Sequence, residues 1–146
     1  MPRILVVDDE ADVRTMISIV LRIHRFEIVE AASGTAALKA FDDLSFDVAI
    51  VDVFLDGING FDLITMMRER VSDLAVVAIS GMATLDFVSQ SPELANVVCL
   101  QKPFRPNDLM VAIQAARQAV WQSTAAVVSQ KAWPAEPKRT PRRTGT

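Results

Sequence analysis

Three consecutive acidic residues, Asp8, Asp9 and Glu10, directly follow the aliphatic run ILVV at positions 4–7. Carboxylates this close repel one another, and burying them without a partner costs free energy. The sequence therefore predicts a positive charge beside them. Because no Cys or His lies nearby, a hard cation suits these carboxylates best, and Mg²⁺ prefers a few carboxylates, waters and phosphate oxygens.

Three other polar residues end or follow apolar runs. Asp52 ends DVAIVD, Ser80 ends LAVVAIS, and Lys102 follows VVCLQ. An aspartate can act as a nucleophile and form an aspartyl phosphate. A lysine can pair with the phosphate as a point charge, and a serine hydroxyl can donate a hydrogen bond to it. Together with a metal, these side chains indicate phosphoryl transfer.

Short Val- and Ile-rich runs alternate with helix-length segments along the chain. The runs typical of strands are residues 3–7, 26–31, 47–52, 74–80 and 97–101. The expected helices are residues 11–23, 33–43, 60–70, 83–91 and 106 to about 121. This alternation predicts an α/β, doubly wound (flavodoxin-like) fold with five parallel strands in the order 2-1-3-4-5 and five helices on both faces. In such a fold ligands bind at the carboxyl ends of the strands, where the polar residues stand.

Charge is distributed unevenly along the 146 residues. Residues 1–121, the expected domain, hold 10 basic and 17 acidic residues, a net charge of −7. Residues 122–146 hold five basic residues and one acid, a net of +4, and are rich in Pro, Thr and Arg, which predicts a flexible tail. The acidic domain argues against broad nucleic-acid binding and leaves the basic tail as the one candidate for a weak contact with nucleic acid.

The chain is expected to act in the cytoplasm. The single cysteine, Cys99, cannot form an internal disulfide, which favours a reducing compartment. The N-terminus lacks a signal-peptide pattern, and no apolar stretch approaches the roughly 20 residues of a membrane helix.

The motifs VVDDE, AIVD, AIS and KPF occur in this order within residues 1–121. In this respect the chain resembles the response-regulator receiver domains of bacterial two-component signalling. The resemblance implies a Mg²⁺-dependent phosphoacceptor that takes its phosphoryl group from a histidine kinase or a phosphorelay protein and hydrolyses it slowly. The implied roles are Asp52 as phosphoacceptor and metal ligand, Asp9 and the backbone carbonyl of Phe54 as further metal ligands, Asp8 as a ligand through water, Ser80 and Lys102 as phosphoryl contacts, and a cis peptide bond between Lys102 and Pro103.

Some positions depart from the pattern of that family. Cys99 stands where an aromatic switch residue is usual, so the aromatic side chain of that switch is missing. Asp56 replaces a common proline, and Asn59 replaces a common aspartate. Phe54, two residues after Asp52, places a bulky apolar side chain near the path of attacking water, and we expect it to alter the dephosphorylation rate.

The sequence is compatible with three functions. The first is a stand-alone receiver, because the 25 residues after the domain are too few for a DNA-binding domain. Its output would be protein binding, phosphorelay or competition for phosphate, with a homodimer through strands 4 and 5 and the last helix as one candidate assembly. The second is a receiver-like partner-binding module that is not phosphorylated. The third is an aspartate-nucleophile phosphohydrolase, disfavoured because Phe54 lacks a proton-transfer group.

Overall fold

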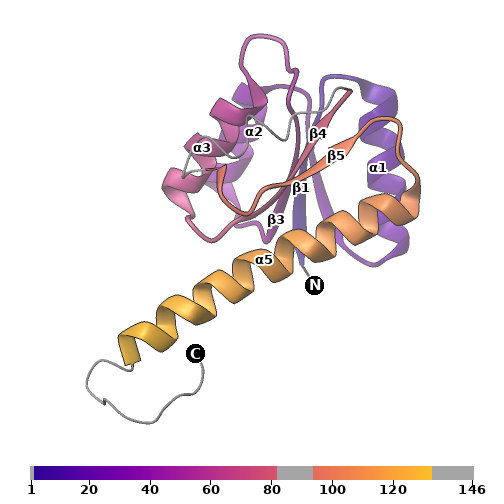
Figure 1. Cartoon of the computed structure of the whole chain (residues 1–146). Helices are drawn as coiled ribbons and strands as arrows, with labels where there is room; N and C mark the ends of the chain where they lie inside the picture. The colour runs from indigo at the N-terminus through magenta and orange to yellow at the C-terminus, as the bar shows by residue number, and fades with distance from the viewer. Residues whose placement is uncertain (1, 82–93, 133–146) are drawn as a thin grey trace.

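Five parallel strands form the sheet of the computed structural model, which describes residues 2–81 and 94–132 (Figure 1). The strands lie side by side in the order β2-β1-β3-β4-β5, so the predicted fold class and strand order are confirmed. Each strand starts at or one residue after its predicted start. Their bounds are β1 (Arg3–Val7), β2 (Glu27–Ala31), β3 (Val48–Asp52), β4 (Ala75–Ser80) and β5 (Val98–Gln101).

Four helices accompany the sheet within the described residues. They are α1 (Ala11–Ile23), α2 (Gly34–Asp43), α3 (Gly60–Arg70) and α5 (Pro106–Ala132). The helix expected at residues 83–91 lies outside the described residues. The expected end of the last helix near Trp121 is wrong, because α5 continues to Ala132.

The side chains of each strand divide between two cores, one on each face of the sheet. Successive residues of a strand point to opposite faces. In β1, Leu5 and Val7 pack in a cluster with α2 and α3, whereas Ile4 and Val6 pack in a cluster with α1 and α5. The sheet is therefore covered on both sides, which explains why its strands are apolar at consecutive positions.

Polar side chains fix the starts of α2 and α3. The Ser33 hydroxyl accepts a hydrogen bond from the backbone N–H of Ala36 at 3.1 Å, and the Asn59 side chain accepts one from Phe61 at 2.7 Å. Both are N-caps that satisfy backbone donors of the first helical turn. The caps set where each helix begins after its loop.

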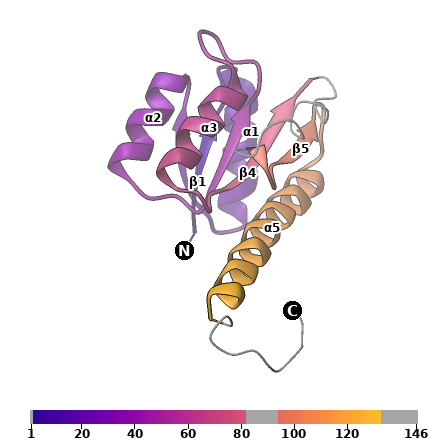
Figure 2. The same ribbon diagram turned by 60° about the vertical axis from the view of Figure 1, so that its left-hand side comes forward.

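Helix α5 packs against β4 and β5 through residues of its first half. Its buried residues there are Leu109, Ala112, Ile113 and Ala116. Beyond them the helix runs past the sheet (Figure 2), and the Trp121 side chain is 72% exposed. The second half of α5 therefore projects away from the domain.

Candidate functional site

The predicted polar residues meet at one edge of the sheet. Asp8 follows β1 directly, Asp52 is the last residue of β3, and Lys102 follows β5. Because all five strands are parallel, their carboxyl ends lie at the same edge. Strands β1 and β3 are neighbours at the centre of the sheet, so the first two of these acids are brought together.

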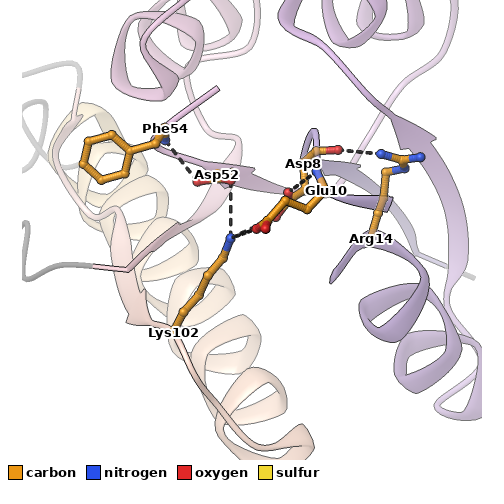
Figure 3. Close-up of polar contacts among 6 residues, drawn as sticks. All are labelled: Asp8, Glu10, Arg14, Asp52, Phe54 and Lys102. Atoms are coloured by element: carbon orange, nitrogen blue, oxygen red, sulfur yellow. Dashed lines mark hydrogen bonds and ion pairs between the residues drawn. The ribbon is translucent and has the colours of Figure 1, made fainter. Parts of the chain in front are cut away.

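The ammonium group of Lys102 lies among three carboxylates (Figure 3). Its Nζ is 3.0 Å from Oε1 of Glu10, 3.4 Å from Oδ2 of Asp8 and 3.4 Å from Oδ2 of Asp52. Oxygens of the three acids lie within 4.8 Å of one another. The positive partner that the run of acids predicts is therefore present, and it is Lys102.

Two of the three carboxylates are buried. Asp8 is 1% exposed and Asp52 is 4% exposed. Burial raises the pKa of Asp8 above its ordinary value, and the nearby charge of Asp52 adds to the rise, while Lys102 opposes it. The site thus holds one carboxylate whose ionised form is disfavoured in the free protein.

The same contacts act in the opposite direction on Lys102. Burial alone would lower the pKa of Lys102, but the hydrogen bond that it donates to Glu10 and the charges of Asp8 and Asp52 more than offset burial and raise the pKa. The lysine is therefore held in its charged form.

Backbone groups also hold the buried acids in place. Oδ1 of Asp8 accepts a hydrogen bond from the backbone N–H of Glu10 at 2.8 Å, and Oδ1 of Asp52 accepts one from Phe54 at 3.0 Å. Arg14 donates from Nη1 to the backbone carbonyl of Asp8 at 2.7 Å. These bonds leave the Oδ2 atoms of both acids turned to Lys102.

The remaining predicted residues surround this cluster. Ser80 is buried, and its backbone carbonyl accepts a hydrogen bond from Lys102 N–H at 2.7 Å. The Phe54 ring is 54% exposed and points away from the acids, so it stands at the rim of the site (Figure 3). Cys99 is half-buried on β5, and the peptide bond between Lys102 and Pro103 is cis.

The cluster differs from the sequence prediction at two residues, Glu10 and Asp9. Glu10 belongs to the group of three close carboxylates, whereas Asp9, which is half-buried, is absent from it in the described part of the chain. The run of three acids contained the signal for Glu10. What the sequence lacked was the direction in which each consecutive side chain points after β1.

Comparison with known proteins decides the family. The family model described as "Response regulator receiver domain" matches residues 4–114. The chain belongs to this family. As a receiver domain it is part of a signalling protein of the two-component type.

Relatives and solved structures agree with this assignment. The DNA-binding response regulator MtrA of Mycolicibacterium paratuberculosis is 34% identical over 113 residues, which are 77% of this chain and 50% of MtrA. A receiver-domain protein from Clostridium thermocellum is 28% identical with a TM-score of 0.74, covering 86% of this chain and 99% of that one. The chemotaxis protein CheY4 of Vibrio cholerae is 26% identical with a TM-score of 0.74, covering 80% and 98%. The chain thus spans about half the length of the MtrA relatives but nearly all of the solved receivers.

The residues of the receiver site fit a hard divalent cation. Oδ2 of Asp8 is buried and accepts no hydrogen bond from the described residues, because its 3.4 Å contact with Lys102 is an ion pair without hydrogen-bond geometry. A carboxylate oxygen in that position favours a cation. The acidic cluster is therefore compatible with Mg²⁺.

Among residues 2–81 and 94–132, no helix is both long enough and apolar enough to span a membrane.

Proposed function

We propose that Asp52 accepts a phosphoryl group from a phosphohistidine of a sensor kinase or a phosphotransfer protein. The observation that carries this proposal is the buried Asp52 carboxylate at the end of β3, 3.4 Å from Lys102 Nζ, in a chain of the receiver family. In the transfer an oxygen of Asp52 attacks phosphorus. The bond from phosphorus to the imidazole nitrogen breaks, and the nitrogen keeps the electron pair.

The side chains around Asp52 have separate roles in this proposal. Lys102 contacts the phosphoryl oxygens as a point charge, and Ser80 donates its hydroxyl to them. Asp52, Asp9 and the Phe54 carbonyl would hold Mg²⁺ directly, and Asp8 would hold it through water. When bound, Mg²⁺ supplies charge neutralisation for the phosphoryl oxygens. The support for Asp9 is its position beside Asp8 in the sequence motif.

The proposed output is a protein contact that depends on phosphorylation, made in the cytoplasm. The new phosphate adds roughly −1.5 to −2 charge, enough to bias a two-state surface. The net charge of −7 on residues 1–121 supports a protein partner for the domain rather than DNA. Because relatives are named as DNA-binding, the phosphorylated chain should be tested in a mobility-shift assay with duplex DNA, where we expect no retention.

No turnover of substrates is expected. Phe54 offers no proton-transfer group two residues after Asp52, and its ring points away from the acids (Figure 3). A generic phosphomonoester should therefore not be hydrolysed, and only slow loss of phosphate from Asp52 itself is expected.

The decisive experiment is incubation with acetyl phosphate, with and without Mg²⁺, followed by intact mass. We expect the mass of one phosphate to be gained only with Mg²⁺, and to be lost in Asp52→Asn. Asp56→Asn, an exposed acid in the following loop, is the matched control and should behave as the unmodified chain. Absence of any gain would instead favour the partner-binding module, for which the half-buried Cys99 at the position of the usual aromatic is the specific support.

A further inference from the structure

Glu10 is the exposed member of the three carboxylates that contact Lys102. Its side chain is 63% exposed, against 1% for Asp8 and 6% for Asp52. Nevertheless, it makes the shortest contact, 3.0 Å from Oε1 to Nζ. Figure 3 shows the side chain extending from the start of α1 towards the lysine.

This contact is unfavourable for a site that must receive an anion. The Lys102 ammonium donates hydrogen bonds to Glu10 and Asp52 and forms an ion pair with Asp8, so an incoming phosphoryl oxygen competes with three carboxylates for the same positive charge. The two buried acids are held by backbone N–H groups of Glu10 and Phe54, whereas no described hydrogen bond other than that from Lys102 holds the Glu10 carboxylate. Glu10 is therefore the acid that can leave most easily.

On the basis of the phosphoacceptor function above, we propose that Glu10 competes with the phosphoryl group for Lys102 and thereby slows phosphorylation of Asp52. Its carboxylate acts as a stand-in anion that holds the ammonium in place while Asp52 is unmodified. When the phosphoryl group arrives, the carboxylate swings out to solvent. Glu10 is in this sense a positioning residue, because it acts through Lys102 and leaves the transfer step itself unchanged.

Glu10→Gln tests the competition, because it removes the charge and keeps the shape. With acetyl phosphate and saturating Mg²⁺, Asp52 attacks phosphorus, the bond from phosphorus to the acetyl oxygen breaks, and acetate leaves with the electron pair. We expect the rate of this reaction to rise about two- to fivefold, the range of an exposed ion pair. We expect the apparent affinity for beryllofluoride, a phosphoryl mimic, to rise by a similar factor in a thermal-shift titration.

Two further variants distinguish an effect of the contact between Glu10 and Lys102 from an effect of the net charge of the protein. Glu27→Gln removes an acid of similar exposure from an ion pair of 2.9 Å with Arg3, at the opposite end of the sheet, and should leave both values unchanged. Glu10→Asp keeps the charge but shortens the reach, so it should resemble Glu10→Gln. If Glu10→Gln is phosphorylated faster but Glu10→Asp is phosphorylated at the rate of the unmodified chain, the effect comes from overall charge. That result would refute the competition for Lys102.

Other results overturn the proposal in recognisable ways. A fall of about tenfold or more in Mg²⁺ affinity of Glu10→Gln, measured by calorimetry, would make Glu10 a metal ligand instead. If Glu10→Gln and the unmodified chain have equal phosphorylation rates and equal beryllofluoride affinities, Glu10 has no effect on the reaction. If the unmodified chain itself takes up neither phosphate nor beryllofluoride, the phosphoacceptor function fails, which is distinct from failure of the role of Glu10 alone.

Discussion

A Cβ atom added at Gly60 would lie 2.3 Å from the backbone oxygen of Asp52. Real Cβ atoms do not approach that closely, so only glycine fits where α3 begins. The backbone N–H of Gly60 also donates to the Val53 carbonyl at 2.8 Å. The peptide of the proposed phosphoacceptor is thus held directly against the start of α3.

Gly60→Ala should therefore lower the free energy of unfolding by about 1–3 kcal/mol, the usual cost of overpacking. Urea denaturation measures this change. Gly81→Ala is the matched control, because an added Cβ there meets no described atom within 4 Å. Equal stability of the two variants would show that α3 can move away from Asp52.

Mg²⁺ should stabilise the folded chain. Two buried acids and one exposed acid share a single ammonium, so a bound cation relieves their repulsion. At 100 times the Kd the gain in unfolding free energy should be about 2.7 kcal/mol, and Asp52→Asn should abolish most of it. Thermal denaturation at fixed ionic strength checks this, and an equal gain from NaCl would mean charge screening alone.

Asp8→Asn should stabilise the metal-free chain at neutral pH. Because burial raises the pKa of Asp8 in the folded state, ionising it costs stability, and this cost is fully present above the folded pKa. It is relieved as the pH falls through that pKa, and it vanishes below the unfolded value of about 4. We therefore expect a gain of about 1 kcal/mol at pH 7 that disappears near pH 3. Denaturation in EDTA across this range measures it, and a loss of stability at pH 7 would show that the ion pair with Lys102 outweighs burial.

Arg14 should support the loop that carries the acids. Its guanidinium donates to the Asp8 carbonyl at 2.7 Å and pairs with Glu30 at 3.2 Å, joining α1 to the ends of β1 and β2. Arg14→Ala should cost about 1–2 kcal/mol and weaken Mg²⁺ binding severalfold. Calorimetry and urea denaturation check both effects, with the exposed Arg22→Ala as control. If both variants behave alike, the loop holds its shape without the arginine.

Much of the fold was predictable because the apolar patterns and the helix-capping residues of the sequence agree with the packing of the sheet and helices. Apolar residues at consecutive positions in residues 47–52 require cover on both faces, and the two cores provide it. Ser33 and Asn59 mark helix starts by chemistry that acts within three residues. The end of α5 was missed because the apolar residues of positions 122–132 lack a helical spacing in the sequence, although this segment contains no proline or glycine. The first proline after the start of α5 is Pro134, and a proline disfavours helix at the residue before it.

The site was predictable in its residue types and less so in its contacts. The ends of the parallel strands determined that Asp8, Asp52 and Lys102 would meet. The contact of Glu10 was not accessible, because a long exposed side chain has many rotamers and its partner lies 92 positions away in the sequence. Only the folded arrangement shows that Glu10 joins Asp8 beside the lysine.

The projecting half of α5 amplifies any movement of the half that packs on the sheet. Ala116 is the last residue of α5 that is buried among those whose side chains are described, and from it to Ala132 the helix extends about 24 Å at 1.5 Å per residue. Its fixed part packs on β4 and β5, the strands that end at Ser80 and just before Lys102. A tilt of about 10° at the sheet would carry the far end through about 4 Å. Any tilt of α5 on the sheet is thus magnified at the far end of the helix.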